Sequence, residues 1–168
     1  MTEQCAVGEA PEESRRDQVV AWSMVAIQFA LIALIVLVPG GDAWTVPAWL
    51  DALGAFAMFA GVAVMVIGAL RLGRGLTPTP LPNACARLQT TGLYRFVRHP
   101  IYSGLLLFAL ARTAVSADWV HVVLCALLIA LLTVKARWEE QRLAARFPDY
   151  GAYAARTPRF VPRPRPAR

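Results

Sequence analysis

The chain has 168 residues, of which 57% are hydrophobic and 17% are charged, so it is too apolar and too weakly charged for an ordinary soluble domain. Its formal net charge is +6, but it contains no zinc-finger, helix-turn-helix or RNA-binding signature, which argues against nucleic-acid binding. We expect an all-α, polytopic membrane protein that forms one domain over residues 1–168.

Four apolar segments predict transmembrane helices, at residues 19–38, 50–70, 101–117 and 119–135. A helix of about 20 apolar residues crosses the ~30 Å hydrocarbon core of a bilayer. The third segment contains Arg112, whose long side chain can reach the interface. The acidic stretch at residues 1–18 is expected to form an N-terminal tail rather than a cleaved signal peptide.

The distribution of Lys and Arg predicts the orientation of these helices. Nearly all of them lie before the first span, between the second and third spans, or after the fourth, and Arg112 is the exception. Because basic segments are retained in the cytoplasm, we expect both termini to be cytoplasmic. The membrane is then the inner membrane if the host is bacterial, and the basic segments are expected to attract anionic lipid headgroups.

Two segments outside the predicted spans are unusual. The connection at residues 71–100 is much longer than a helical turn needs, and loops of that length are often functional. No helix breaker occurs between Val134 and Phe147, so the fourth helix is expected to continue into a cytoplasmic extension and basic tail at 136–168. Asp149 is expected to cap a short helix at 150–156.

Other positions predict packing at the ends and along the spans. The small residues of the second span favour close helix packing, within the chain or between chains. At the outer end of the bundle, Arg112 and Asp118 are expected to pair, and His121 to bond to a neighbouring helix.

The sequence lacks several familiar chemical sites. It has no Rossmann or P-loop motif and no nucleophile elbow. Its two histidines and three cysteines do not have metal-ligand spacing, so no metal site is expected. Taken singly, Arg98-His99-Pro100 is typical of an interfacial anchor. Similarly, Lys135, Glu139 and Arg142 share one helix face and can form surface ion pairs worth about 0.3–0.5 kcal/mol each.

Two motifs in order change this interpretation. The first, "RLQTTGLYRFVRHPIYSG", contains a Gly-x-Tyr turn followed by Arg-His-Pro-x-Tyr-x-Gly. The second, "EEQRLAARFPDYGAYAARTPRFVP", begins with Glu-Glu and continues with spaced Leu, Phe, Tyr and Pro. From about Leu76 to Pro162 the chain resembles the isoprenylcysteine carboxyl methyltransferase and phospholipid methyltransferase family of integral-membrane enzymes. The first two spans match that family only in hydropathy.

The resemblance implies an S-adenosylmethionine-dependent methyltransferase that acts on a lipophilic or small membrane-soluble acceptor at the cytoplasmic face. It departs from the family at Gln89, where an aliphatic residue is common, and at Lys135, where the isoprenylcysteine enzymes carry an arginine. His99 and Glu139 are the expected catalytic residues, and Lys135 and Arg142 the expected substrate-binding residues. The expected cofactor-binding residues are Leu88, Gln89, Tyr94, Arg98, His99, Pro100, Ile101, Tyr102, Glu139 and Glu140.

These residue types suit the cofactor. A glutamate can bind its ammonium or ribose, Arg98 its carboxylate, and a tyrosine face its sulfonium. Methyl transfer depends mainly on alignment, and an amine or thiol acceptor must also lose a proton, for which His99 or a glutamate is a candidate. The acceptor stays open between a carboxylate, amine, hydroxyl and thiol. Two other functions also stay open: an NADPH-dependent membrane reductase of the sterol-reductase type, and a lipid-binding scaffold without enzymatic activity.

Overall fold

The computed structural model describes residues 14–81 and 87–163, and within them it is all-α, with five α-helices and two short 3₁₀ turns. This confirms the all-α part of the predicted fold class. The predicted N-terminal tail lies mostly outside the described residues, and its last part is already helical. The elements are α1 (Arg15–Leu37), α2 (Ala48–Leu72), η1 (Gly73–Gly75), η2 (Gly92–Arg95), α3 (Pro100–Ser116), α4 (Trp119–Arg146) and α5 (Tyr150–Arg156).

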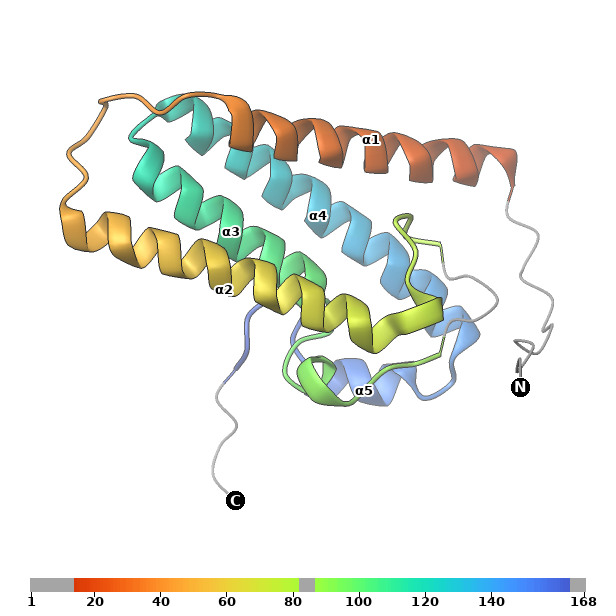
Figure 1. Cartoon of the computed structure of the whole chain (residues 1–168). Coiled ribbons are helices and arrows are strands. Elements are labelled where there is room, and N and C mark those ends of the chain that lie inside the picture. The colour runs from red at the N-terminus through yellow and green to blue at the C-terminus, as the bar shows by residue number, and fades with distance from the viewer. Residues whose placement is uncertain (1–13, 82–86, 164–168) are drawn as a thin grey trace, which may run out of the picture.

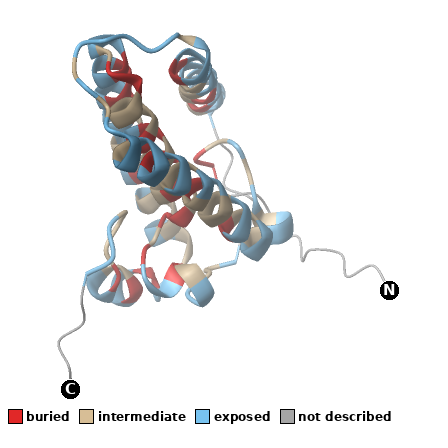
Figure 2. Ribbon diagram, turned by 60° about the vertical axis from the view of Figure 1, so that its left-hand side comes forward, coloured by how far each residue is buried: buried red, intermediate tan, exposed pale blue. Residues whose placement is uncertain are grey.

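Three of the helices, α1, α2 and α4, are long and apolar enough to cross a membrane. Three of the four predicted spans are therefore confirmed, and α3 is a shorter apolar helix of 17 residues. Large apolar side chains such as Phe29, Phe56 and Phe59 are exposed on the helices, as lipid contact requires. Exposed residues run along the outer sides of the helices in Figure 2. These are the properties of an integral membrane protein.

The four long helices lie side by side in the spatial order α1, α4, α3, α2 (Figure 1). Helix α4 thus lies between α1 and α3, and α2 packs on the opposite side of α3. The apolar core lies between α1, α3 and α4. Its buried members are Leu31, Ile35, Leu105, Ala109, Leu124, Cys125, Leu128 and Leu132.

The close pairing of α2 with α3 depends on glycines. Gly54, Gly61 and Gly68 are buried at intervals of seven residues on one face of α2. A Cβ atom on Gly61 would lie 2.6 Å from the carbonyl oxygen of Gly104 in α3, and one on Gly104 would lie 2.5 Å from the carbonyl oxygen of Gly61. The small-residue face predicted for the second span therefore packs within the chain, against α3.

At the end of the bundle opposite α5, the predicted Arg112–Asp118 pair does not form, and the predicted bond of His121 to a neighbouring helix is made by its backbone and not by its ring. Arg112 donates from Nη2 to the carbonyl of Val38 (3.2 Å) and is not paired with Asp118 among the described contacts. Asp118 is the N-cap of α4, where its carboxylate accepts from the Val120 N–H (3.2 Å). The same carboxylate lies 3.2 Å from Nδ1 of His121, so the His121 ring bonds to the start of its own helix, while the His121 carbonyl accepts from the Thr113 hydroxyl of α3 (3.3 Å). Asp118 binds at the start of α4 because the first N–H groups of a helix have no partner within the helix.

The extension of the fourth helix is confirmed, because α4 continues to Arg146, and α5 occupies the predicted range Tyr150–Arg156. The predicted side-chain cap is wrong: Asp149 precedes α5 but makes no capping hydrogen bond. Its backbone is already in the right-handed helical region (φ −78°, ψ −6°), whereas a capping side chain requires an extended backbone.

Candidate functional site

The end of the bundle that carries α5, called the α5 end below, is closed by hydrogen bonds between segments that are distant in sequence. Tyr153 of α5 donates to the carbonyl of Tyr94 (2.6 Å), and Tyr94 donates to the carbonyl of Gly68 in α2 (3.3 Å). Burial raises the pKa of Tyr153 to about 12, although Arg98 acts in the opposite direction. Burial, followed by the nearby Glu139 charge, raises the pKa of Tyr94 well above its usual range. Both hydroxyls therefore remain protonated donors at neutral pH.

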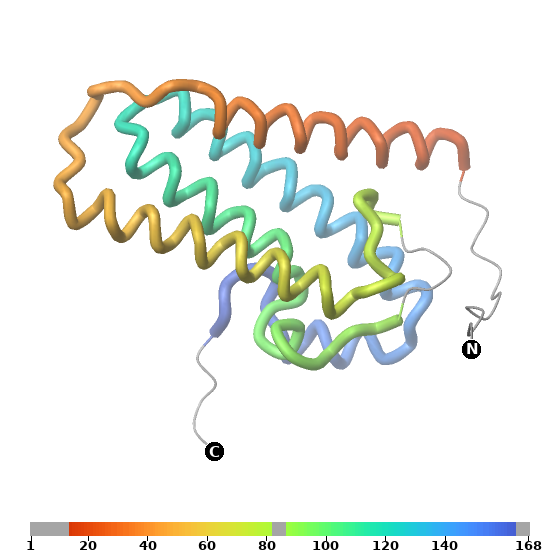
Figure 3. Tube along the Cα trace, viewed as in Figure 1, coloured from red at the N-terminus to blue at the C-terminus, as the bar shows by residue number. Residues whose placement is uncertain are grey.

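The segment after α5 returns to the start of α3 (Figure 3). The N–H of Arg98 donates to the carbonyl of Pro158 (2.9 Å), and the N–H of His99 donates to the carbonyl of Arg159 (3.2 Å). One turn into α3, Ser103 donates from Oγ to the carbonyl of Phe160 (2.7 Å). These bonds position the Arg159 side chain beside α4.

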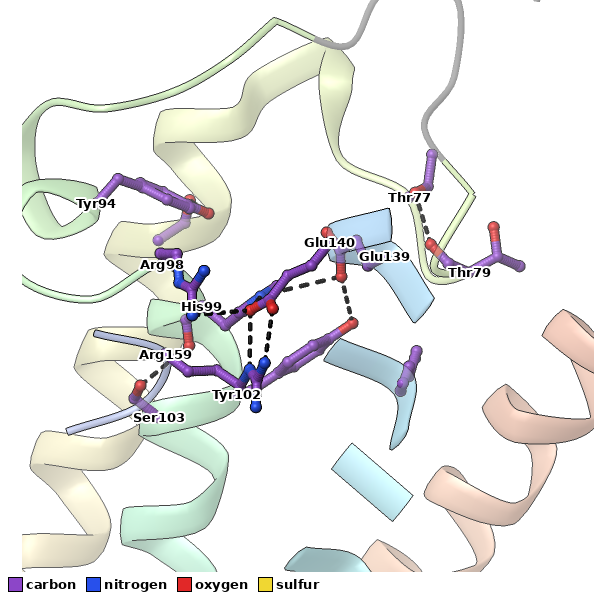
Figure 4. A network of polar contacts seen from close by, with 12 residues as sticks. Thr77, Thr79, Tyr94, Arg98, His99, Tyr102, Ser103, Glu139, Glu140 and Arg159 are labelled. Atoms are coloured by element: carbon purple, nitrogen blue, oxygen red, sulfur yellow. Dashed lines mark hydrogen bonds and ion pairs between the residues drawn. The ribbon is translucent and has the colours of Figure 1, made fainter. Parts of the chain in front are cut away.

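Glu140 is the centre of a cluster formed with Arg98, His99 and Arg159 (Figure 4). Arg159 donates from Nε to Oε1 (2.8 Å) and from Nη2 to Oε2 (2.7 Å). Nε2 of His99 lies 3.0 Å from Oε1, and Nη2 of Arg98 lies 3.4 Å from it. The Glu140 side chain is only 11% exposed, and its hydrogen bond raises the pKa of Arg159. Groups of the protein itself thus balance the negative charge of the Glu140 carboxylate.

Glu139, the adjacent residue, has a different environment. Its Oε2 accepts a hydrogen bond from the Tyr102 hydroxyl (3.0 Å) and lies 3.7 Å from Nδ1 of His99. The His99 and Tyr102 rings stack, with centroids 5.3 Å apart and planes 5° apart. The Glu139 side chain is 25% exposed, and its contacts within the described residues use Oε2. A ligand can therefore approach this carboxylate through Oε1.

Lys135, one turn before Glu139, lies inside the bundle and is 2% exposed. Its Nζ donates to Oε1 of Gln28 in α1 (2.7 Å) and to the carbonyl of Pro78 (2.9 Å), and lies 5.6 Å from the centre of the Tyr102 ring. It therefore joins α4 to α1 and to the connection that follows α2.

The surface ion-pair network predicted for Lys135, Glu139 and Arg142 does not form. Lys135 binds neutral oxygens, while Nη2 of Arg142 lies 3.4 Å from Oδ1 of Asp17 in α1. The Arg142 guanidinium also stacks over the Trp138 ring at 3.9 Å. The network fails because α1 lies along α4 and supplies partners that helix periodicity does not show.

Four of the expected cofactor-binding residues have other contacts. Gln89 donates to the carbonyl of Arg71 (3.2 Å). Pro100 and Ile101 pack against α2 at Gly68. Leu88 lines a pocket beside α5 rather than the Glu139 group. The structure thus brings together Tyr94, Arg98, His99, Tyr102, Glu139 and Glu140, to which it adds Arg159.

Sequence reasoning missed Arg159, because its signal was only a basic residue in the second motif. It also missed the pocket beside α5, whose volume is about 570 Å³. The pocket is lined by Leu88, Thr90, Arg95, Asp149, Ala152, Tyr153, Arg156 and Thr157.

The described residues contain no group of three or more His, Cys, Asp or Glu side chains arranged to hold a metal ion.

Fold and site together define an all-α integral membrane protein with an ion-paired polar cluster at one end of its bundle. The family model for the NnrU protein matches residues 14–163. The chain therefore belongs to the NnrU family.

Two curated proteins are similar over most of the chain. The cobalt-zinc-cadmium resistance protein CzcN of Cupriavidus metallidurans is 32% identical over 149 residues, which cover 88% of this chain and 65% of that protein. The nickel-cobalt-cadmium resistance protein NccN of Alcaligenes xylosoxydans xylosoxydans is 29% identical over 133 residues, covering 79% of this chain and 60% of that protein. The chain thus spans somewhat less than two thirds of the length of these relatives.

The family assignment made from the two sequence motifs is therefore wrong. The isoprenylcysteine and phospholipid methyltransferase resemblance rested on short motifs at a membrane boundary and matched the first two spans only in hydropathy. The NnrU match includes those spans, and it extends from the start of α1 to the segment after α5. Arg-His-Pro before a helix and Glu-Glu at the end of another are too short to distinguish families that share such a boundary.

Proposed function

We propose that this protein is an S-adenosylmethionine-dependent methyltransferase acting on a lipophilic or small membrane-soluble acceptor. The proposal rests on one observation: a partly exposed carboxylate, Glu139, is held by Tyr102 beside the His99 ring. S-adenosylmethionine carries an ammonium and a sulfonium, and a partly exposed carboxylate suits either cation. The support comes from the site itself and not from the rejected family.

The residues have distinct tasks in this proposal. When bound, S-adenosylmethionine would supply an electrophilic methyl group for transfer to the acceptor, with the electron pair of the broken carbon–sulfur bond left on sulfur. Glu139 binds and orients the cation through Oε1, and Tyr102 fixes Glu139 through Oε2. Because one ring nitrogen of His99 faces Glu139 and the other faces Glu140, His99 positions the two carboxylates. The catalytic role of His99 and the substrate contacts of Lys135 and Arg142 stay predictions.

An amine, hydroxyl or thiol acceptor must also release a proton, whereas a carboxylate acceptor need not. Because Glu139 holds the cation in this proposal, His99, which faces both carboxylates, stays the candidate for receiving this proton. Catalysis then depends mainly on alignment of donor and acceptor.

We also propose that α3 is the fourth span and that both termini and the α5 end face the cytoplasm of a bacterial host. The concentration of Lys and Arg at this end supports this orientation. Cysteines replacing Asp42 and Asp149, in a background without the native cysteines, test it in intact cells. A membrane-impermeant maleimide should label position 42 and not position 149, and the reverse pattern would contradict the proposal.

Calorimetric titration of the purified protein with S-adenosylhomocysteine tests the cofactor. Binding should be weakened at least tenfold by Glu139→Gln and by Tyr102→Phe, and unchanged in Arg137→Gln, an exposed position of α4. Methyl transfer from labelled S-adenosylmethionine to a membrane lipid extract then identifies the acceptor. Binding of NADPH instead would favour a reductase, and binding of neither by a folded sample would favour a scaffold.

A second candidate is a contribution to metal tolerance, favoured by the similarity to the two metal-resistance proteins. Deletion of the gene should then lower growth in cobalt, zinc, nickel or cadmium, and the intact gene should restore it. If the Glu139→Gln variant accumulates normally but fails to restore growth, metal tolerance depends on the same site as the proposed methyl transfer.

A further inference from the structure

The pocket beside α5 is separate from the Glu139–Tyr102 pair. One wall is formed by residues at and before η2, with Leu88, Thr90 and Arg95, and the other by α5 and its flanks. Its volume of about 570 Å³ is sufficient for a small polar ligand. Two of its lining residues, Tyr153 and Thr157, are buried.

Three charged side chains line this pocket. Arg95 and Arg156 come from opposite walls, and Asp149 precedes α5. In the part of the chain that the structure describes, none of the three forms an ion pair. Arg95 lies 5.8 Å from the Phe96 ring centre, and Arg156 donates only from Nε to the carbonyl of Ala152 (3.0 Å).

This arrangement contrasts with the nearby cluster around Glu140, where arginines at the same end are paired within the chain. Asp149 and Arg156 stand at opposite ends of α5, about 10 Å apart at 1.5 Å per residue. Their opposite charges are therefore presented at separate points of one pocket. An uncharged ligand would pair with none of these charges, and a purely anionic ligand would pair only with the arginines.

We propose that the pocket binds a zwitterionic group, with a phosphate or carboxylate between Arg95 and Arg156 and an ammonium at Asp149. Guanidinium groups from two walls suit an anionic group that accepts several hydrogen bonds, and a carboxylate suits an ammonium. Two sources carry this chemistry: a phosphoethanolamine headgroup of a membrane lipid, and the α-amino-acid end of a soluble molecule. With α3 as the span proposed above, Arg95, which lies five residues before it, places the pocket close to the membrane surface. This inference does not depend on the proposed function.

Both sources can be tested on the same variants. For the soluble source, calorimetry measures binding of O-phosphoethanolamine and of L-methionine to the purified protein. For the lipid source, native mass spectrometry measures retention of dioleoyl phosphatidylethanolamine against dioleoyl phosphatidylglycerol, which lacks the ammonium. The variants are Arg156→Gln and Asp149→Asn, and the control is Arg137→Gln on α4, which removes the same charge as Arg156→Gln. All three positions are exposed, so folding should persist and is checked by helicity and gel filtration.

The expected result is binding in at least one arm, weakened about tenfold by Arg156→Gln and by Asp149→Asn, and unchanged in the control. Asp149→Asn should leave inorganic phosphate binding equal or tighter, because the substitution removes a negative charge. Binding in the lipid arm alone identifies the headgroup, and binding in the soluble arm alone identifies the amino-acid end. Absence of binding in both arms overturns the proposal, as does Asp149→Asn leaving the zwitterion affinity unchanged.

Discussion

Arg159 binds Glu140 through two parallel hydrogen bonds of 2.8 and 2.7 Å, although the two residues are 19 positions apart. This pair joins the segment after α5 to α4. It also uses both oxygens of Glu140, so that the adjacent Glu139 is the carboxylate left for a ligand. The α5 end is organised around this difference between two consecutive glutamates.

Replacing Glu140 by glutamine should destabilise the α5 end. Two guanidinium groups and the His99 ring then surround a neutral amide, and the expected loss is about 1.5–3 kcal/mol, as for a hydrogen bond to a charged group. Thermal unfolding in detergent measures it. Arg163→Gln, on an exposed residue of the same segment, is the control and should change little. An unchanged melting temperature for Glu140→Gln would contradict the role assigned to this cluster.

The glycine contact between α2 and α3 predicts a strong effect of one methyl group. In Gly61→Ala the new carbon meets a backbone carbonyl at 2.6 Å, and backbone cannot move aside without separating the helices. We expect a loss of about 1–3 kcal/mol, measured by thermal unfolding. Gly151→Ala in α5 meets nothing within 4 Å and should be neutral or stabilise by about 0.5–1 kcal/mol. Equal stability of the two variants would be inconsistent with the close crossing.

Lys135 and Gln28 should be energetically coupled. Lys135→Met removes the donor of the Gln28 side chain and of the Pro78 carbonyl, which are only partly buried, so the expected cost is about 0.5–1.5 kcal/mol, as for an ordinary hydrogen bond. Adding Gln28→Leu removes one of these unpaired groups, so the double variant should be more stable than the sum of the single effects predicts. Denaturant unfolding of all four proteins measures the coupling, and strict additivity would show that the contact contributes nothing.

The buried tyrosines predict an alkaline limit to stability. Because the pKa of Tyr153 is raised to about 12 in the folded protein, its neutral form is favoured there more than in the unfolded chain. This stabilisation is complete below pH 10 and is lost as the pH rises toward 12. Tyrosinate absorbance against pH should show one ionisation fewer near pH 12 in Tyr153→Phe. Ionisation of every tyrosine near pH 10 in the folded protein would contradict this assignment.

Local features of the chain were readable without the tertiary structure. The lengths of α1, α2 and α4, the continuation of α4 to Arg146 and the bounds of α5 follow from apolar length and from the positions of helix breakers. These are properties of one segment and its immediate flanks. The intrachain packing of the glycine face of α2 was one of two alternatives that the pattern left open.

The identity of polar partners depended on segments that meet only in the folded chain. Glu139 and Glu140 are equivalent in the sequence, but they point about 100° apart on the helix, and only Glu140 faces the returning segment that carries Arg159. Lys135 has the spacing of a surface residue and is buried because α1 and the connection at Pro78 cover it. Hydrophobic length is encoded along the chain, whereas the pairing of charges depends on which distant segments pack together.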